Sequence, residues 1–81
     1  MELSIVGINQ NKKFAVKWVE LQTKVGNFII QSGHRPMVVE LQANSQVRFC
    51  LDSSKQDKVD ISAGIVHITR ESISILIDSQ L

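Results

Sequence analysis

The sequence has very few of the residues that mark a secreted or redox-active protein. Its only cysteine is Cys50, so no disulfide can form within the chain. The first residues lack the basic segment, apolar stretch and cleavage site of an exported protein, and we therefore expect the chain to work in a reducing cytoplasm. Because Cys50 lies between Phe49 and Leu51, we expect it to be a small buried hydrophobe rather than a reactive thiol.

An excess of charge of one sign is also lacking. Nine basic residues stand against eight acidic ones, which leaves a formal net charge of +1. This balance gives no general attraction to phosphate backbones or anionic lipids. No apolar run approaches the roughly 18 residues that span a bilayer, so we expect any membrane association to come through another protein.

No set of residues is arranged for catalysis. The carboxylates are scattered, and neither of the glycine-rich phosphate-binding patterns GxGxxG and GxxxxGK[ST] occurs. The two histidines, His34 and His67, are far apart and have no cysteine or carboxylate cluster beside them, so a metal site is a weak hypothesis. His67 is more simply an outward-facing strand residue. We expect a protein that is not an enzyme and that needs no cofactor or metal ion.

No stretch has the i, i+3, i+4, i+7 apolar spacing of a convincing helix, whereas apolar and polar residues alternate repeatedly along the chain. Many short strands at close spacing, without crossover helices, predict one all-β domain over residues 1–81, a flattened antiparallel β-sandwich or barrel of roughly eight to ten short strands. The predicted strands are Leu3–Ile8, Phe14–Gln22, Phe28–Ile30, Met37–Leu41, Gln46–Asp52, Lys58–Ser62, Gly64–Thr69 and Ser72–Asp78.

The second predicted strand breaks its own alternation. Phe14, Val16 and Trp18 have one parity, but Val19 and Leu21 have the other. A β-bulge near Trp18 and Val19 would add one residue, bring both sets to the same face and bend the strand. The polar residues 9–13 are expected to form the turn before it.

A small all-β domain could also be a nucleic-acid-binding barrel, in which aromatic rings stack on bases beside a basic groove. Lys12, Lys13, Phe14, Trp18 and Phe28 are the residues that suggest this alternative function. Against it stand the absence of tyrosine, the low count of other aromatic residues and the small net charge. In such strands Phe14 and Trp18 are more often core residues.

Residues 26–37 join an apolar strand bounded by glycines to a polar loop. Gly26 and Gly33 permit sharp turns, and Pro36, the only proline, fixes φ and removes a donor. His34 is therefore expected on a stiff loop, and this loop is where we expect function to lie.

Two blocks of residues stand out by their order and spacing. The first consists of Val16, Val19, Leu21, Thr23, Gly26, Phe28, Ile30, Gly33, His34, Pro36 and Met37, and the second of residues 62–68 and 73–78. Both resemble the N-terminal β-sandwich of the epsilon subunit of the F-type ATP synthase, which is called delta in mitochondria. The first block corresponds to the family pattern T-x-x-G-x-x-G-I-L-P-x-H-x-P-L, and the second to G-G-F-x-x-V followed by a V-T-I-L-x-D strand, in the right order and at nearly the right distance.

The resemblance implies a non-catalytic part of the rotor's central stalk, which binds the gamma subunit and the membrane c ring during proton-coupled ATP synthesis. It implies a peripheral place on the cytoplasmic face of the inner (plasma) membrane of a bacterium. His34 would lie toward gamma and Asn27 near the polar loops of the c ring. The residues expected at this partner interface are Asn27, Gln31, Ser32, Gly33, His34 and Arg35.

A subunit of this kind must also bury an exposed face against gamma, so some outward strand positions should be apolar. Leu76 and Ile65 fit that expectation, and both could equally be core residues on the second face of a sandwich.

The sequence departs from the family pattern at several positions. Ile29 stands where the family usually has glycine, Gln31 and Ser32 replace an apolar residue and a proline, and Ala63 replaces the first glycine of a pair. Asn27 replaces a frequent glutamate, so a ring contact there would depend on hydrogen bonding rather than charge. Family members commonly continue into an inhibitory two-helix hairpin, and because the sequence stops just after the last predicted strand we expect a chain without it.

Overall fold

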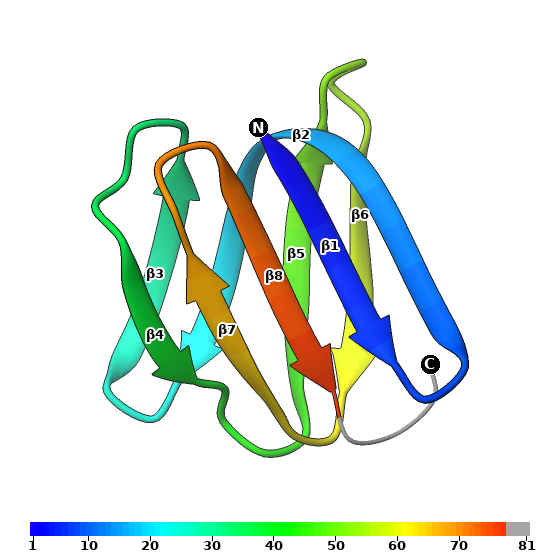
Figure 1. Cartoon of the computed structure of the whole chain (residues 1–81), viewed down its shortest axis with the longest axis vertical. Coiled ribbons are helices and arrows are strands. Elements are labelled where there is room, and N and C mark those ends of the chain that lie inside the picture. Colours follow the sequence, from blue (N-terminus) through cyan, green and yellow to red (C-terminus); the bar gives the residue numbers. More distant parts are fainter. Residues whose placement is uncertain (78–81) are drawn as a thin grey trace.

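The computed structural model describes residues 1–77, and every regular element in that range is a β-strand (Figure 1). No helix able to span a bilayer occurs among these residues. The strands are β1 (Glu2–Gly7), β2 (Gln10–Thr23), β3 (Gly26–Gln31), β4 (Met37–Glu40), β5 (Ser45–Leu51), β6 (Gln56–Ile61), β7 (Gly64–Ile68) and β8 (Ser72–Ile77).

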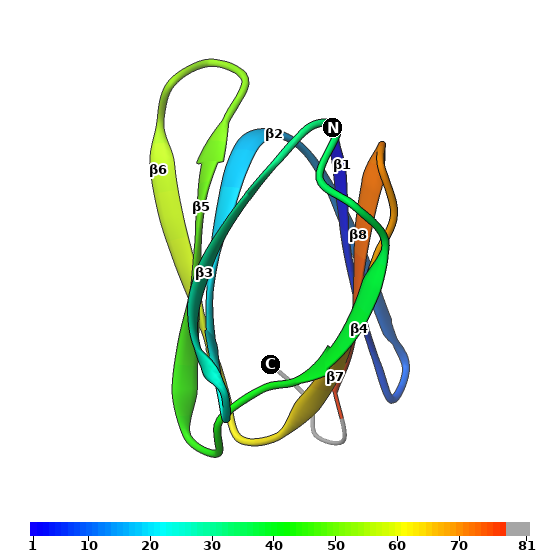
Figure 2. The ribbon, with the colours of Figure 1, turned by 90° about the vertical axis from the view of Figure 1, so that its left-hand side faces the viewer.

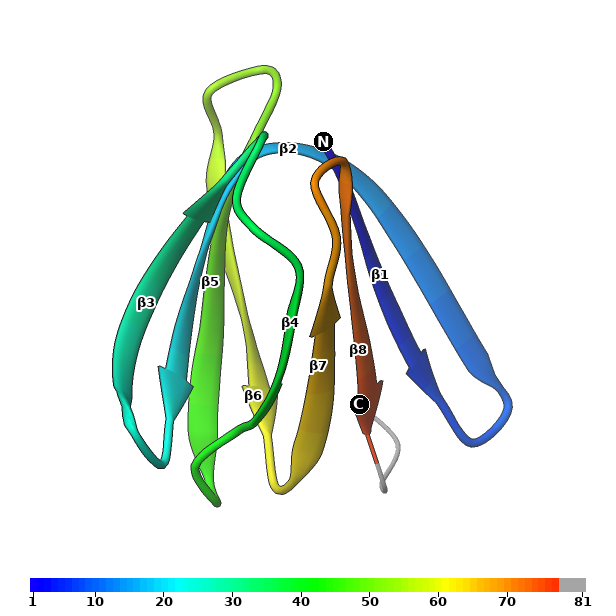
Figure 3. The same ribbon diagram turned by 60° about the vertical axis from the view of Figure 1, so that its left-hand side comes forward.

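The strands form two layers that face each other across the core (Figure 2). One layer, called sheet A here, holds β4, β7, β8, β1 and the first half of β2. The other layer, sheet B, holds β3, the second half of β2, β5 and β6. Figure 3 shows β2 arching from one layer to the other, so that both belong to one curled sheet of eight strands. The predicted all-β sandwich or flattened barrel is confirmed.

The bend in β2 comes from a local change of register. Val16 pairs with Leu51 and Trp18 with Cys50, so Lys17 is the extra residue of a β-bulge. The predicted bulge is therefore confirmed, one residue earlier than expected. Because the extra residue precedes Trp18, the prediction that Trp18 shares a face with Phe14 and Val16 is wrong: Val16 and Val19 are buried in the core, and Trp18 is half-buried on the other face of the strand.

One pair of strands corrects the prediction of a purely antiparallel sheet. β1 and β8 are parallel, with Leu3 opposite Ile73 and Ile5 opposite Ile75, whereas all other described pairs are antiparallel. A short hairpin forces two strands to run antiparallel, but β1 and β8 are separated by the rest of the chain, so no hairpin sets their direction.

The observed strand bounds differ from the predicted ones by a residue or two, except at the start of β2. Gly7 pairs with Gln10, so the turn consists of Ile8 and Asn9 alone and is shorter than the polar segment 9–13 suggests. Asn9 has a φ of 60°, in the left-handed region that asparagine tolerates better than most residues. Asp78, the predicted end of the last strand, lies outside the described residues.

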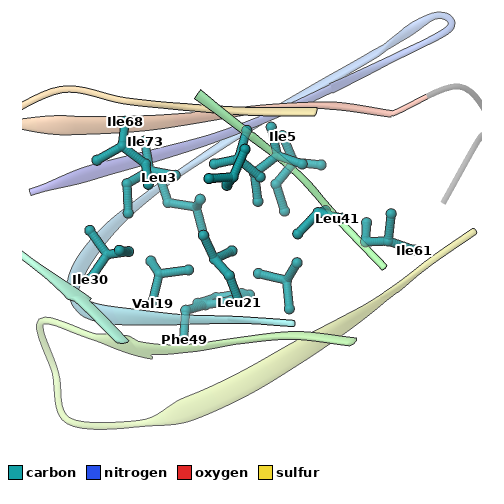
Figure 4. Close-up of a cluster of buried hydrophobic side chains, with 14 of the residues drawn as sticks. Leu3, Ile5, Val19, Leu21, Ile30, Leu41, Phe49, Ile61, Ile68 and Ile73 are labelled. Carbon is teal, nitrogen blue, oxygen red and sulfur yellow. The ribbon is translucent and has the colours of Figure 1, made fainter. Parts of the chain in front are cut away.

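The hydrophobic core fills the space between the two sheets (Figure 4). Each strand contributes alternate residues to it, as the period of two requires, and burial of each large aliphatic or aromatic side chain contributes about 1.5–3 kcal/mol. Cys50 is buried as the sequence predicts, although it does not belong to this cluster. The core residues are Leu3, Ile5, Val16, Val19, Leu21, Ile30, Val39, Leu41, Val47, Phe49, Ile61, Val66, Ile68, Ile73, Ile75 and Ile77.

Candidate functional site

The described residues contain no group of three or more histidine, cysteine, aspartate or glutamate side chains that could hold a metal ion. His67 is exposed on β7, opposite Val38 and Ser74, as the outward strand residue that its sequence predicts. The thiol of Cys50 is buried and donates a 3.5 Å hydrogen bond to the carbonyl oxygen of Leu51.

The loop that carries His34 connects sheet B to sheet A, because it follows β3 and leads into β4 (Figure 2). Gly33 has a φ of +87°, a conformation that strains any residue with a Cβ atom. Its amide donates a 2.7 Å hydrogen bond to the carbonyl oxygen of Arg70 in the turn between β7 and β8. The amide of His34 donates to the carbonyl oxygen of Gln31 at 3.1 Å. The loop is therefore held against the opposite layer by a hydrogen bond, which agrees with the stiff loop that the sequence predicts.

The His34 side chain turns back on its own loop. Its Nδ1 atom lies 2.8 Å from the carbonyl oxygen of Arg35, and the residue is half-buried. The predicted interface residues around it, Gln31, Ser32, Gly33 and Arg35, are exposed. His34 thus shapes the loop through its ring, while its neighbours present the surface.

Asn27 does not join this group. It lies at the opposite end of β3, where it pairs with Gln22, and it is exposed. At about 3.3 Å per residue, the strand places Asn27 roughly 13 Å from Gln31, where the loop that carries His34 begins. The structure therefore divides the predicted interface into two surfaces, one at each end of β3 (Figure 1).

Two apolar residues flank Asn27, and sequence analysis did not assign either of them to a site. Val25, in the turn between β2 and β3, is 78% exposed, and Ile29, two residues along β3 from Asn27, is 60% exposed. Because alternate strand residues share a face, Asn27 and Ile29 point the same way. The sequence feature that could have identified Val25 is its place as an apolar residue in a turn.

A third surface lies on the outer side of sheet A. Val38, Ile65 and Leu76 are exposed there, at 65%, 51% and 55%, and we call these three residues the apolar face. Ile65 and Leu76 are direct cross-strand neighbours, and Val38 lies on the adjacent strand β4. A hollow of about 350 Å³ adjoins them, lined by Glu40, Ala63, Gly64, Ile65, Leu76 and Ile77.

This arrangement decides the question that the sequence left open for Ile65 and Leu76. Both residues point away from the core, and no other described strand covers them. Exposed apolar side chains that lie next to one another are typical of interaction surfaces, whereas singly scattered ones are not.

The aromatic residues give the nucleic-acid-binding alternative no support. Phe14 packs against Phe49 of the core with ring centroids 4.9 Å apart, and Phe28 also packs against the core. Trp18 is half-buried. Lys12 and Lys13 are exposed, but none of the aromatic residues within residues 1–77 is exposed enough to form a platform on which bases could stack.

Comparison with known proteins gives matches over nearly the whole chain. The family described as "ATP synthase, Delta/Epsilon chain, beta-sandwich domain" matches residues 1–81. The ATP synthase epsilon chains of Mycobacterium tuberculosis and Mycobacterium bovis are each 28% identical to this chain over 80 residues, which are 98% of this chain and 66% of theirs.

Two solved structures have the same fold. A chain in the structure of the Euglena gracilis mitochondrial ATP synthase (OSCP/F1/c-ring in rotational state 1) matches with a TM-score of 0.86 and 21% identity, over 98% of this chain and 51% of that one. A chain in the central stalk and c ring of the Tetrahymena thermophila mitochondrial ATP synthase matches with a TM-score of 0.80 and 13% identity, over 98% of this chain and 63% of that one.

The chain thus spans about two thirds of the length of the mycobacterial relatives. The two solved chains share only the fold with this chain, whereas the family matches its sequence over residues 1–81. The resemblance seen in the two sequence blocks is confirmed: this chain belongs to the delta/epsilon chain family of the ATP synthase, in which it corresponds to the beta-sandwich domain.

Proposed function

We propose that this chain is a non-catalytic subunit of the central stalk of an F-type proton-translocating ATP synthase, where it couples the gamma subunit to the membrane c ring. The observation that carries the proposal is the family match over residues 1–81. The mycobacterial relatives named ATP synthase epsilon chain support a bacterial setting. The subunit would then lie on the cytoplasmic face of the inner membrane and be held there through the complex.

The fold suits a part that must transmit torque. The two sheets enclose a core in which most large side chains are fully buried, and β2 links the layers because it pairs with strands of both sheets. A close-packed interior has low compressibility, and cross-strand hydrogen bonds resist sliding of one strand past another. A domain built in this way passes a load between partners with little deformation.

We assign the contact with gamma to the apolar face and the loop from Gln31 to Arg35. The two surfaces meet at Val38, which follows Arg35 by three positions, whereas Ile65 and Leu76 lie two register positions farther from the loop. Specific interfaces bury at least about 1,200 Å² in total and need an apolar centre with a polar rim. Val38, Ile65 and Leu76 would form that centre, and the loop would supply part of the rim.

We assign the contact with the c ring to Asn27 together with Val25 and Ile29. These residues lie at the far end of β3 from the His34 loop, so one molecule can meet two partners at once. The surface carries no charge of its own at these three positions, and a polar contact through the Asn27 amide is less sensitive to salt than an ion pair.

Co-purification with gamma tests this assignment. Leu76→Glu places a charge in the apolar face and should abolish binding of the recombinant gamma subunit of the same organism. Ile29→Glu is the matched control, because Ile29 is 60% exposed against 55% for Leu76 but lies on sheet B. It should leave gamma binding intact and weaken attachment of the gamma complex to the c ring.

Two results would contradict the proposal. If the unaltered chain fails to bind gamma, the assignment to the central stalk is wrong. If Leu76→Glu binds gamma as well as the unaltered chain does, the apolar face is not the contact. Circular dichroism of both variants establishes that they are folded, which we expect because both positions face solvent.

A further inference from the structure

We propose that Arg35 and Arg70 together form a docking site for an acidic segment of the protein that binds the His34 loop, with carboxylates of that segment paired to both guanidinium groups. The inference rests on the proposed function, because it names the chemistry by which the partner recognises this loop. It concerns Arg70 in particular, which lies far from the loop in sequence and outside the interface that the sequence predicts.

The structure brings the two arginines to one end of the molecule. The Gly33 amide donates to the carbonyl oxygen of Arg70 at 2.7 Å, and a guanidinium nitrogen of Arg70 lies 3.5 Å from the carbonyl oxygen of Gly33. Arg35 follows Gly33 by two positions. Figure 2 shows the β3–β4 connection and the turn between β7 and β8 at the same end of the fold.

Both side chains start from backbone that is already held in place. The loop is held by the hydrogen bond from His34 to Gln31 and by the contact of the His34 ring with the Arg35 carbonyl oxygen. The turn is closed by the 2.9 Å hydrogen bond from the Thr69 amide to the Ser72 carbonyl oxygen. Binding therefore needs little ordering of the main chain, which lowers the entropic cost of docking.

Neither guanidinium has a counter-ion within residues 1–77. The single ion pair among these residues joins Lys24 to Glu40 at 3.0 Å. Glu71, the acidic residue next to Arg70, makes no ion pair with it in the described part of the chain. Arg35 and Arg70 are both exposed, and within residues 1–77 only one of the five N–H donors on Arg70 is engaged, in a long hydrogen bond of 3.5 Å.

The chemistry of this site favours carboxylates on a protein over an extended polyanion. A guanidinium presents two parallel N–H donors that match a carboxylate, so each of the two arginines can take one acidic group of the segment. Nucleic acids and anionic membranes are bound through many cations along a surface, whereas this chain has a net charge of only +1. Two isolated arginines on ordered backbone therefore fit an acidic protein segment.

The test measures binding of the full chain to the recombinant gamma subunit of the same organism at 50 and 300 mM salt. The variant R35E/R70E should weaken binding by about 30-fold or more at the lower salt and by less at the higher salt, because like charges then meet at the interface. Arg70→Lys keeps the charge but loses the planar fork, and should weaken binding by about threefold.

The control variant is R48E/K58E. Arg48 and Lys58 are also exposed basic residues, and they are cross-strand neighbours on the outer side of sheet B. The double change alters the net charge by the same amount, so it separates a local effect from a general one. It should change the affinity for gamma by less than about threefold.

The outcomes distinguish this inference from the proposed function. If the unaltered chain binds gamma and R35E/R70E binds equally well, the docking site is wrong and the proposed function stands. Equal losses in R35E/R70E and R48E/K58E also overturn the docking site, because the effect is then general electrostatics. Failure of the unaltered chain to bind gamma removes the proposed function, and the docking site with it.

A charge exchange completes the test. Replacing acidic residues of gamma by lysine, one at a time, should restore binding of R35E/R70E at one or more positions. If no lysine replacement in gamma restores binding, the arginines do not recognise an acidic protein segment. The same conclusion follows if the parent binds an oligonucleotide or phosphatidylglycerol vesicles and R35E/R70E loses that binding while it still binds gamma.

Discussion

Leu3 of β1 and Ile73 of β8 lie opposite each other in parallel register, although almost the whole described chain separates them. Both are completely buried. Their pairing joins the first and last described strands in the middle of sheet A, with β7 and β4 on one side and β2 on the other. The sheet that carries the apolar face therefore depends on contacts between the two ends of the described chain.

Shortening Ile73 should strongly destabilise the domain. Ile73→Ala removes buried methyl groups and leaves a cavity between the sheets, so we expect the free energy of unfolding to fall by about 2–5 kcal/mol. Ser74→Ala, one position along on the outward side of the same strand, should cost less than about 1 kcal/mol. Urea denaturation followed by fluorescence or circular dichroism measures both, and equal losses would contradict the burial of the Ile73 side chain between the sheets.

Deleting Lys17 tests the bulge in β2. Without it, Val16, Trp18 and Val19 would alternate regularly, so no side chain must change sides. The strand would lose the bend that carries it between the sheets, and we expect a loss of about 1–3 kcal/mol in thermal or chemical unfolding. Lys17→Ala is the control: it removes only an exposed 2.6 Å hydrogen bond to Ser54 and should cost no more than about 0.5 kcal/mol. A deletion variant as stable as the parent would show that the bulge does not set the bend.

Gly64 should not tolerate alanine. A Cβ atom at this position would lie 2.9 Å from the carbonyl oxygen of Leu76, which is backbone and cannot move aside without shifting β8. We expect Gly64→Ala to cost about 1–3 kcal/mol and to disturb the apolar face beside it. Calorimetry gives the loss of stability, and binding to gamma gives the effect on the surface. An unchanged melting temperature would mean that the two strands can separate at little cost.

Asn27→Glu should make attachment to the c ring depend on salt. Asn27 is exposed, so the change should alter folding stability by no more than about 0.5 kcal/mol. The new charge is screened at high ionic strength, so the affinity of the gamma complex for the ring should differ between 50 and 300 mM salt for the variant and little for the parent. Gln56→Glu, at an exposed position of β6 on the same sheet, is the matched control and should leave ring binding unchanged. If both variants respond equally, Asn27 is not at the ring.

Much of the fold could be read from local sequence pattern. The alternation of Ile73, Ile75 and Ile77 with polar residues predicted a strand with one buried face, and all three isoleucines are buried. The parity change after Trp18 predicted a bulge to within one residue. Two residue blocks, neither sufficient alone, predicted the family that the match over residues 1–81 confirms.

Other features could not be read in this way. The direction of β1 against β8 depends on how distant strands meet, and no turn between them constrains it. Asn27 and His34 are close in sequence, and the prediction placed both on one loop, His34 toward gamma and Asn27 toward the c ring, but Asn27 lies in the extended strand β3 that precedes the loop. Arg70 could not be joined to the loop at all, because only the backbone hydrogen bond from Gly33 brings it there.

The sequence by itself determined where the strands lie, which side chains of each strand can be buried and which family the chain belongs to, because these follow from local alternation and short motifs. The tertiary structure alone decided that Ile65 and Leu76 face outward, that the predicted interface divides into two surfaces and that Arg35 and Arg70 share one end of the molecule. The physical reason is that burial and proximity depend on which strands pack together, and packing is set by contacts between segments that are far apart along the chain.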